Sequence, residues 1–260
     1  MSSKIGPFYL LKVLREFRGE VADARPLVVA GAKELVPLLA RELRAGGDPA
    51  AVREGGSVTD ASALVWLGPP DEQALRDASR AKVPIVGVTE GESLPYVLDT
   101  ALVTVQAGRG FPLEEIADVL ARQLREHGTT LAARLPVLRE ALVDELIRST
   151  SRHNAVIAVG IVIPGVGMPV LTLNQIRLVL RIARTYGRIT DQSLAPEVLG
   201  VVGAGLGWRT LARELLDFAP VGGWAVKGGI AYTGTRAIGE AARRFYAARA
   251  PSGAGPTLPA

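Results

Sequence analysis

The sequence contains no cysteine and only two histidines, His127 and His153, among its 260 residues. Disulfide bonds and thiolate metal sites are therefore excluded, and a metal site built from histidines is disfavoured. Aromatic residues make up 5% of the chain, so alanine, valine, leucine and glycine supply most of its apolar character. The absence of cysteine fits a protein of a reducing compartment.

Nucleotide-binding motifs are also missing. A P-loop needs Gly-x-x-x-x-Gly-Lys-Ser/Thr, because converging backbone N–H groups and a lysine must reach the phosphates. After its first apolar run the chain offers GAKE, so Gly31 and Lys33 form only a weak candidate phosphate site. No Asn-Lys-x-Asp guanine reader follows the third apolar run, and Gly203 opens a partial dinucleotide fingerprint in which Trp208 replaces the third glycine. We expect no cofactor and no catalytic residue set.

Charge is divided unevenly along the chain. Residues 1–150 hold 18 basic and 21 acidic side chains, a balance of −3, whereas residues 151–260 hold 12 and 5, a balance of +7. The shift predicts a domain boundary near residue 150, and the basic part points toward an anionic surface. Ser149, Ser151 and His153 lie at this boundary without a Gly-x-Ser-x-Gly elbow, so a capping or linker role is the better interpretation.

The first part alternates short apolar runs with helical patterns. The runs suit buried parallel strands and occupy residues 26–31, 63–67, 83–88 and 101–105. The helical patterns follow them at 33–45, 72–81 and 111–126. Asp71 is placed to cap the second of these helices. This alternation predicts an α/β domain with a doubly wound, mostly parallel sheet.

The 24 residues that follow Arg152 carry no formal charge when histidine is neutral, which is long enough to cross a bilayer. The segment PGVGMP interrupts their middle, and proline disfavours one straight helix. We expect one helix to end near Ile163, a bent linker, and a second helix to begin near Thr172. The sequence leaves open whether residues 154–173 span a membrane, re-enter it or are buried in protein.

The second of these helices carries a row of arginines that share an arc of roughly 60°. The row comprises Arg177, Arg181, Arg184 and Arg188. A wide apolar arc lies opposite, and an interfacial helix on anionic lipid needs this combination. The same pattern fits a solvated basic face whose apolar arc packs inside the protein, so both interpretations stay open.

Small residues recur at spacings that let helix backbones approach closely. Gly203 and Gly207 form a GxxxG pair. In the last helix small side chains recur every four residues, at Ala225, Gly229, Thr233, Ala237 and Ala241. We expect both sets to form helix-packing faces, in a membrane bundle or in a tight soluble hairpin.

Three segments of the second part, IPGVGMPVLTLNQIRLVLRIARTYG, LGVVGAGLGWRTLARELL and KGGIAYTGTRAIGEAARRFY, resemble in this order the YcjF-like domain of unknown function. That domain occurs in bacterial proteins, is often fused to GTPase domains and is often predicted to be membrane-associated. The resemblance covers roughly residues 150–248 and implies a GTPase-like domain before it, although GTP binding is not carried over because both motifs are absent. Its most recognisable positions are expected to be structural: Gln175, Arg177, Tyr186, Gly187, Thr235 and Gly239.

The resulting organisation has five parts. They are an amphipathic helix (1–24), a degenerate GTPase-like α/β domain (25–128), a connecting helix (129–150), a YcjF-like all-α, glycine-rich domain (151–248) and a disordered tail (249–260). The expected function is that of a non-catalytic bacterial protein at the cytoplasmic side of the inner membrane, with an unidentified protein partner. The alternatives are a divergent GTPase or other NTPase, and a soluble cytoplasmic scaffold or nucleic-acid binder. Nucleic acid is disfavoured because no aromatic stacking platform accompanies the basic residues. Oligomer formation stays open.

Overall fold

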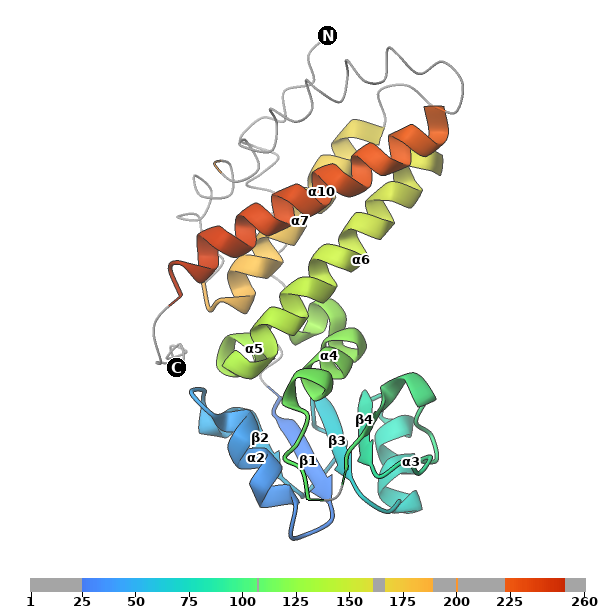
Figure 1. The fold of residues 1–260 in the computed structure, drawn as a ribbon, viewed down its shortest axis with the longest axis vertical. Helices are drawn as coiled ribbons and strands as arrows, with labels where there is room; N and C mark the ends of the chain where they lie inside the picture. Colours follow the sequence, from blue (N-terminus) through green and yellow to red (C-terminus); the bar gives the residue numbers. More distant parts are fainter. Residues whose placement is uncertain (1–24, 107, 161–166, 189–199, 201–222, 251–260) are drawn as a thin grey trace. The chain divides into compact units, whose positions relative to one another are not determined.

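A computed structural model describes residues 25–106, 108–160, 167–188, 200 and 223–250 (Figure 1). The chain divides into compact units, an α/β unit within Ala22–Glu145 and a helical unit within Leu146–Ala250. The coarse prediction of an α/β part followed by a helical part is confirmed. The expected helix at 1–24, the pair Gly203 and Gly207, and the tail from residue 251 lie outside the described residues.

The α/β unit contains a five-stranded, all-parallel sheet in the order β2-β1-β3-β4-β5. The strands are β1 (Leu27–Gly31), β2 (Val52–Glu54), β3 (Ala63–Leu67), β4 (Ile85–Thr89) and β5 (Leu102–Thr104). Strand β3 is paired on both sides, and all of its residues are buried, as its unbroken apolar run predicts. The four predicted strands are therefore present in a parallel sheet.

The edge strand β2 was not predicted. It is three residues long, and two of them, Arg53 and Glu54, are charged. Arg53 pairs with Asp60 at 2.7 Å, and Glu54 pairs with Arg44 at 2.6 Å. So short and polar a segment has no alternating apolar pattern from which a strand can be recognised.

Helices pack on the sheet in the α/β unit (Figure 1). They are α2 (Val36–Arg44) after β1, α3 (Glu72–Arg80) after β3, and α4 (Leu113–Leu124) after β5. On one face, α3 buries Leu75 and Ala78 against Val28, Leu64 and Ile85 of the strands. The connections β1-α2-β2 and β3-α3-β4 run in opposite directions across the sheet, so right-handed crossovers put α2 on the face opposite α3. The order and direction of the strands match those of a doubly wound sheet.

Residues 129–150 do not form the single connecting helix that was predicted. Helix α5 (Thr129–Arg134) ends at an extended Leu135, and Pro136 opens a short 3-10 turn to Leu138. A residue before proline is pushed out of the helical region, which explains the break. Helix α6 (Arg139–Gly160) then runs without interruption through the predicted boundary at residue 150, and the division between the compact units falls within it.

The bounds of α6 and of the next helix, α7 (Gly167–Thr185), differ from two of the predictions. Ser149, Ser151 and His153 lie inside α6, so their interpretation as capping or linker residues is wrong. Helix α7 begins before the predicted Thr172 and includes Pro169. This proline is tolerated because the first N–H groups of a helix have no partner within the helix.

The helical unit also contains α10 (Gly223–Ala247), which runs antiparallel to α6. Three approaches along α6 define their register: Ile147 to Gly239, Asn154 to Thr235, and Val159 to Gly228. The residue numbers rise on α6 as they fall on α10, as expected for antiparallel neighbours. Helix α7 packs against α10 and runs opposite to α6 (Figure 1).

Candidate functional site

A doubly wound sheet of this order has its usual ligand crevice beyond the carboxyl ends of β1 and β3, where the strand order reverses. In this protein the two turns at that point close on each other. The Ala32 N–H donates to the Leu67 carbonyl at 2.9 Å, and a Cβ added to Gly31 would lie 2.1 Å from the same oxygen. A Cβ added to Gly68 would lie 3.4 Å from the Ala32 side chain. The turns that follow β1 and β3 are therefore in close contact at this point.

The weak candidate phosphate site, Gly31 and Lys33, lies in the first of these turns. Gly31 has a φ of 117°, and this backbone conformation serves its close approach to Leu67. Lys33 is exposed, and the N–H groups of Leu35 and Val36 both donate to the Ala32 carbonyl at 3.0 Å. These amides close a turn and do not converge on a ligand, so the geometry favours an ordinary strand-to-helix connection.

The arginine row lies on and just after α7. Arg177, Arg181, Arg184 and Arg188 are all half-buried, and each takes part in interactions within the protein. The apolar arc opposite is buried, with Ile176, Leu178, Val179, Ile182, Ala183 and Tyr186 each exposing 3% or less of their surface. In this conformation the arc packs inside the protein, as the second interpretation of the pattern required.

The packing face of α10 differs from the predicted one. Gly229, Thr233 and Ala237 are exposed, and of Ala225 only the backbone in α10 is described. The close approaches are instead made by Gly228, where an added Cβ would lie 2.9 Å from Val159, and by Gly239, where it would lie 2.6 Å from Ile147. The buried apolar residues Ile238, Ala242 and Tyr246 share this second face. The burial of these apolar residues, and not the spacing of the small residues, decides which face of α10 packs against the other helices.

A layer of polar side chains crosses the centre of the helical unit, and we call it the polar layer. It comprises Asn154 of α6, Asn174 and Gln175 of α7, and Thr235 of α10. The Asn154 amide donates from Nδ2 to Thr235 Oγ1 at 2.9 Å and accepts at Oδ1 from Asn174 Nδ2 at 2.8 Å. Gln175 Nε2 donates to Thr235 Oγ1 at 3.3 Å.

The polar layer was missed in the sequence because single polar residues in an apolar helix do not reveal which partners they meet. Asn154 and Thr235 are fully buried, and Gln175 is nearly so. Gln175, Thr235 and Gly239, expected to be structural from the family resemblance, all contribute here to contacts between helices. Ser151, one turn before Asn154, is also fully buried, and its Oγ has no hydrogen-bond partner among the described residues.

Exposed apolar side chains of the described helical unit gather at one end of α6 and α7. Val156 is 71% exposed, Val159 41% and Val170 37%, and we call these three residues the apolar tip. The Asn154–Asn174 hydrogen bond sets the level of the two helices. Val159 and Val170 lie five and four residues beyond that bond toward the connection, about 6–8 Å along the helices at 1.5 Å per residue.

Basic side chains accompany the apolar tip. Arg152 and His153 are exposed on α6, and Lys227, next to the Gly228 that meets Val159, is exposed on α10. The described residues of 146–250 include eleven lysines and arginines and a single acidic residue, Glu240. The described part of the helical unit thus combines an apolar end with a strongly positive charge.

Across the described residues, no helix is both long enough and apolar enough to traverse a membrane. The same residues contain no group of three or more histidine, aspartate or glutamate side chains that could hold a metal ion. No family model, curated protein or solved structure matches this chain. Its own geometry therefore carries the functional argument.

Proposed function

We propose that this is a non-catalytic protein of an anionic membrane surface, which rests on the bilayer through the apolar tip. The α/β unit is then a binding module for a protein partner on the cytoplasmic side. The observation that carries this proposal is the exposure of Val156, Val159 and Val170 together at one end of α6 and α7. The YcjF-like character of the helical unit and a GTPase-like origin of the α/β unit belong to the same proposal.

Burial of the apolar tip in lipid supplies the first part of the binding energy. Complete burial of a valine side chain stabilises by roughly 1.5 kcal/mol or more. The three valines are only partly exposed, so their transfer into the boundary of a bilayer contributes about 2–3 kcal/mol in total. Such a contribution supports peripheral, reversible association.

Electrostatic attraction supplies the second part. Each lysine or arginine near an anionic surface contributes about 1 kcal/mol, and this contribution falls within a Debye length. Arg152 and Lys227 lie closest to the apolar tip along their helices and are both exposed. The proposal therefore requires anionic lipid and predicts weaker binding at high salt.

The apolar tip is a better surface for membrane contact than the arginine row, which the sequence pattern suggested. The apolar arc opposite the row is already buried, so lipid contact there would require α7 to leave its neighbours. The polar layer opposes such a movement, because separating the helices would leave Asn154 and Thr235 without partners. The valines of the tip need no rearrangement.

Vesicle flotation of the full chain tests the proposal. Vesicles of phosphatidylcholine are compared with vesicles that also contain phosphatidylglycerol, and the protein is expected to float only with the second kind. The double substitution Val156→Asp and Val159→Asp should weaken this binding at least about tenfold, because it removes apolar area and adds negative charge.

A matched control is available in the α/β unit. Leu35 and Leu38 have the same three-residue spacing and are also partly exposed. Leu35→Asp with Leu38→Asp should leave flotation unchanged. A wild-type chain that stays with the buffer in the presence of both kinds of vesicle would refute the proposal, and so would equal losses in the two double variants.

A further inference from the structure

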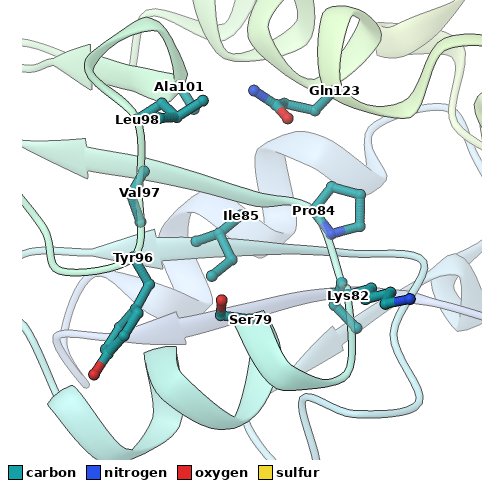
Figure 2. Close-up of a pocket in the computed structure, with 10 residues that line it drawn as sticks. Ser79, Lys82, Pro84, Ile85, Tyr96, Val97, Leu98, Ala101 and Gln123 are labelled. Carbon is teal, nitrogen blue, oxygen red and sulfur yellow. The ribbon is translucent and has the colours of Figure 1, made fainter.

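A pocket of about 310 Å³ opens at the amino-terminal edge of the sheet, which is the edge opposite the nucleotide crevice of doubly wound folds (Figure 2). The end of α3, the beginning of β4, the segment before β5 and the end of α4 all contribute to it. Its lining consists of Ser79, Lys82, Val83, Pro84, Ile85, Tyr96, Val97, Leu98, Ala101 and Gln123. Its volume lies at the lower limit of small-molecule sites.

The chemistry of the lining favours an apolar group joined to an anion. Most of the lining side chains are apolar, and Leu98 is 72% exposed, so a ligand placed against it would remove apolar surface from water. Ser79 and Gln123 offer a hydroxyl and an amide as hydrogen-bond donors. Lys82 is the charged residue among the ten, and none of the ten is acidic.

Backbone strain is concentrated around this pocket. Among the described residues, the non-glycine positions with a left-handed φ are Lys82 at 56°, Tyr96 at 63° and Arg125 at 49°. Lys82 and Tyr96 line the pocket, and Arg125 follows the lining residue Gln123 by two positions. Such conformations persist where the surrounding structure enforces them, and they cluster at ligand sites.

The left-handed φ of Lys82 belongs to the end of helix α3. The Val83 N–H donates to the Ala78 carbonyl at 2.9 Å and the Lys82 N–H to the Ser79 carbonyl at 3.0 Å, the two bonds of a Schellman motif. Glycine is the usual residue at the left-handed position of this motif, because it adopts that conformation without cost. A lysine there sacrifices stability and puts a cation at the pocket.

The opposite end of the pocket is held in place. Tyr96 accepts a hydrogen bond at its hydroxyl from Arg76 Nε at 3.0 Å, and the Arg76 guanidinium lies 5.9 Å from the centre of the tyrosine ring. Figure 2 shows Tyr96 and Lys82 at opposite ends of the group of lining residues. One end is therefore fixed, while the other carries a flexible cationic side chain.

We propose that this pocket binds an apolar group that carries a carboxylate, supplied either by a small fatty acid or by the C-terminus of a polypeptide ending in an apolar residue. The apolar part lies against Ile85, Val97 and Leu98. The Lys82 ammonium, which points away from the other lining residues in Figure 2, swings over the mouth to pair with the carboxylate. This inference concerns the α/β unit and goes beyond the membrane contact of the helical unit.

Titration of the full chain with octanoate, followed by NMR of the leucine and isoleucine methyl groups, tests the proposal. Octanoate is expected to bind saturably and to shift Leu98 and Ile85, whereas octanol and octylamine bind more weakly. Lys82→Gln should weaken octanoate binding about two- to fivefold, the effect expected for an exposed ion pair. Leu98→Ser should weaken the binding of both octanoate and octanol.

Matched controls distinguish the pocket from general surface effects. Arg80→Gln removes an exposed charge from the same end of α3, and Leu38→Ser removes an exposed leucine on α2, and neither residue lines the pocket. Both variants should bind octanoate as the wild type does. Equal weakening by Arg80→Gln and Lys82→Gln would overturn the proposal.

A second arm distinguishes the two sources of the carboxylate. A tetrapeptide ending in leucine is titrated with a free and with an amidated C-terminus. If the peptide with the free C-terminus binds more tightly than octanoate, a polypeptide C-terminus is identified as the ligand. Binding of octanoate alone identifies a small acid. Failure of both to shift the lining methyl groups overturns the proposal, while vesicle flotation reports on the membrane contact independently.

Discussion

The α/β unit and the helical unit treat buried polar side chains differently. In the α/β unit the buried hydroxyls of Ser62 and Thr89 bond to the backbone: Ser62 Oγ donates to the Pro26 carbonyl at 3.1 Å, and Thr89 Oγ1 to the Glu92 carbonyl at 2.9 Å. In the helical unit, Asn154 and Thr235 bond to each other and to side chains of a third helix. These two hydroxyls of the α/β unit thus bond to backbone carbonyls, whereas at the centre of the helical unit a buried amide and a buried hydroxyl join three helices through their side chains.

This difference reflects how each kind of element obtains its register. Neighbouring strands are aligned by the backbone hydrogen bonds of the sheet, so side chains have only to fill the layers above and below it. A helix satisfies its backbone internally, and an apolar face of Val, Leu and Ile tolerates sliding and rotation. A buried polar pair penalises every register that leaves it unpaired, which gives the polar layer a specifying role.

The largest expected effect concerns Gly31 of β1. Gly31→Ala combines a φ of 117°, which non-glycine residues rarely adopt, with a Cβ 2.1 Å from the Leu67 carbonyl oxygen. Because the obstacle is backbone, relief requires the β1–β3 pairing to shift, and we expect the free energy of unfolding of the α/β unit to fall by at least about 4 kcal/mol. Urea unfolding read by hydrogen exchange in each unit measures this.

The matched change in the helical unit is Gly239→Ala. Its Cβ would lie 2.6 Å from Cγ1 of Ile147, so the obstacle is a side chain and not the backbone. The expected loss is about 1–2 kcal/mol, confined to amides of α6, α7 and α10. Equal losses for Gly31→Ala and Gly239→Ala would show that the two close approaches do not differ in rigidity.

The second largest effect concerns the polar layer. Asn154→Ala removes a fully buried amide and leaves Asn174 Nδ2 and Thr235 Oγ1 each without one partner. We expect the helical unit to lose about 2–4 kcal/mol, because each buried polar group without a partner costs about 1–3 kcal/mol. In comparison, Ser62→Ala in the α/β unit should cost only about 1 kcal/mol. The difference disappears if the polar layer is not formed in solution.

A smaller effect depends on pH and belongs to the α/β unit. Burial by itself raises the pKa of Asp48, but the hydrogen bonds from the Ala50 amide and the Arg134 guanidinium bring it below its ordinary value. The hydrogen bond from Arg53 lowers the pKa of Asp60 to about 2. The folded state therefore binds fewer protons than the unfolded one near these pKa values.

Stability from these carboxylates is complete above the unfolded pKa of about 4 and is lost as the pH falls through the lower folded values toward 2. Asp48→Asn should lower the stability of the α/β unit by at most about 1 kcal/mol at pH 6, because the pair with Arg134 is partly solvated, and should change little at pH 2. A larger deficit at pH 2 than at pH 6 contradicts this account.

Elements that depend on local sequence were predictable, whereas faces and contacts were not. The apolar runs gave four of the five strands, and the predicted cap of α3 is present, since Asp71 Oδ1 accepts from the N–H groups of Gln73 and Ala74 at 3.0 and 3.1 Å. On α10, a small-residue stripe and an apolar stripe compete, and only the packing of Ile238 and Tyr246 against other helices decides between them. The lining of the pocket comes from four separate segments, which no local pattern connects.

The smallest expected effect has the opposite sign. Ser151 lies on α6 one turn from Asn154, fully buried, and its Oγ has no hydrogen-bond partner in the part of the chain that is described. Ser151→Ala removes this hydroxyl and improves helix propensity, so we expect the helical unit to be unchanged or stabilised by up to about 1 kcal/mol. Ser149→Ala on the same helix is the matched control, because Ser149 Oγ donates to the Leu146 carbonyl at 3.4 Å. A loss of stability in Ser151→Ala that exceeds the loss in Ser149→Ala would mean that a water molecule joins Ser151 to the polar layer, which would then extend one turn further along α6.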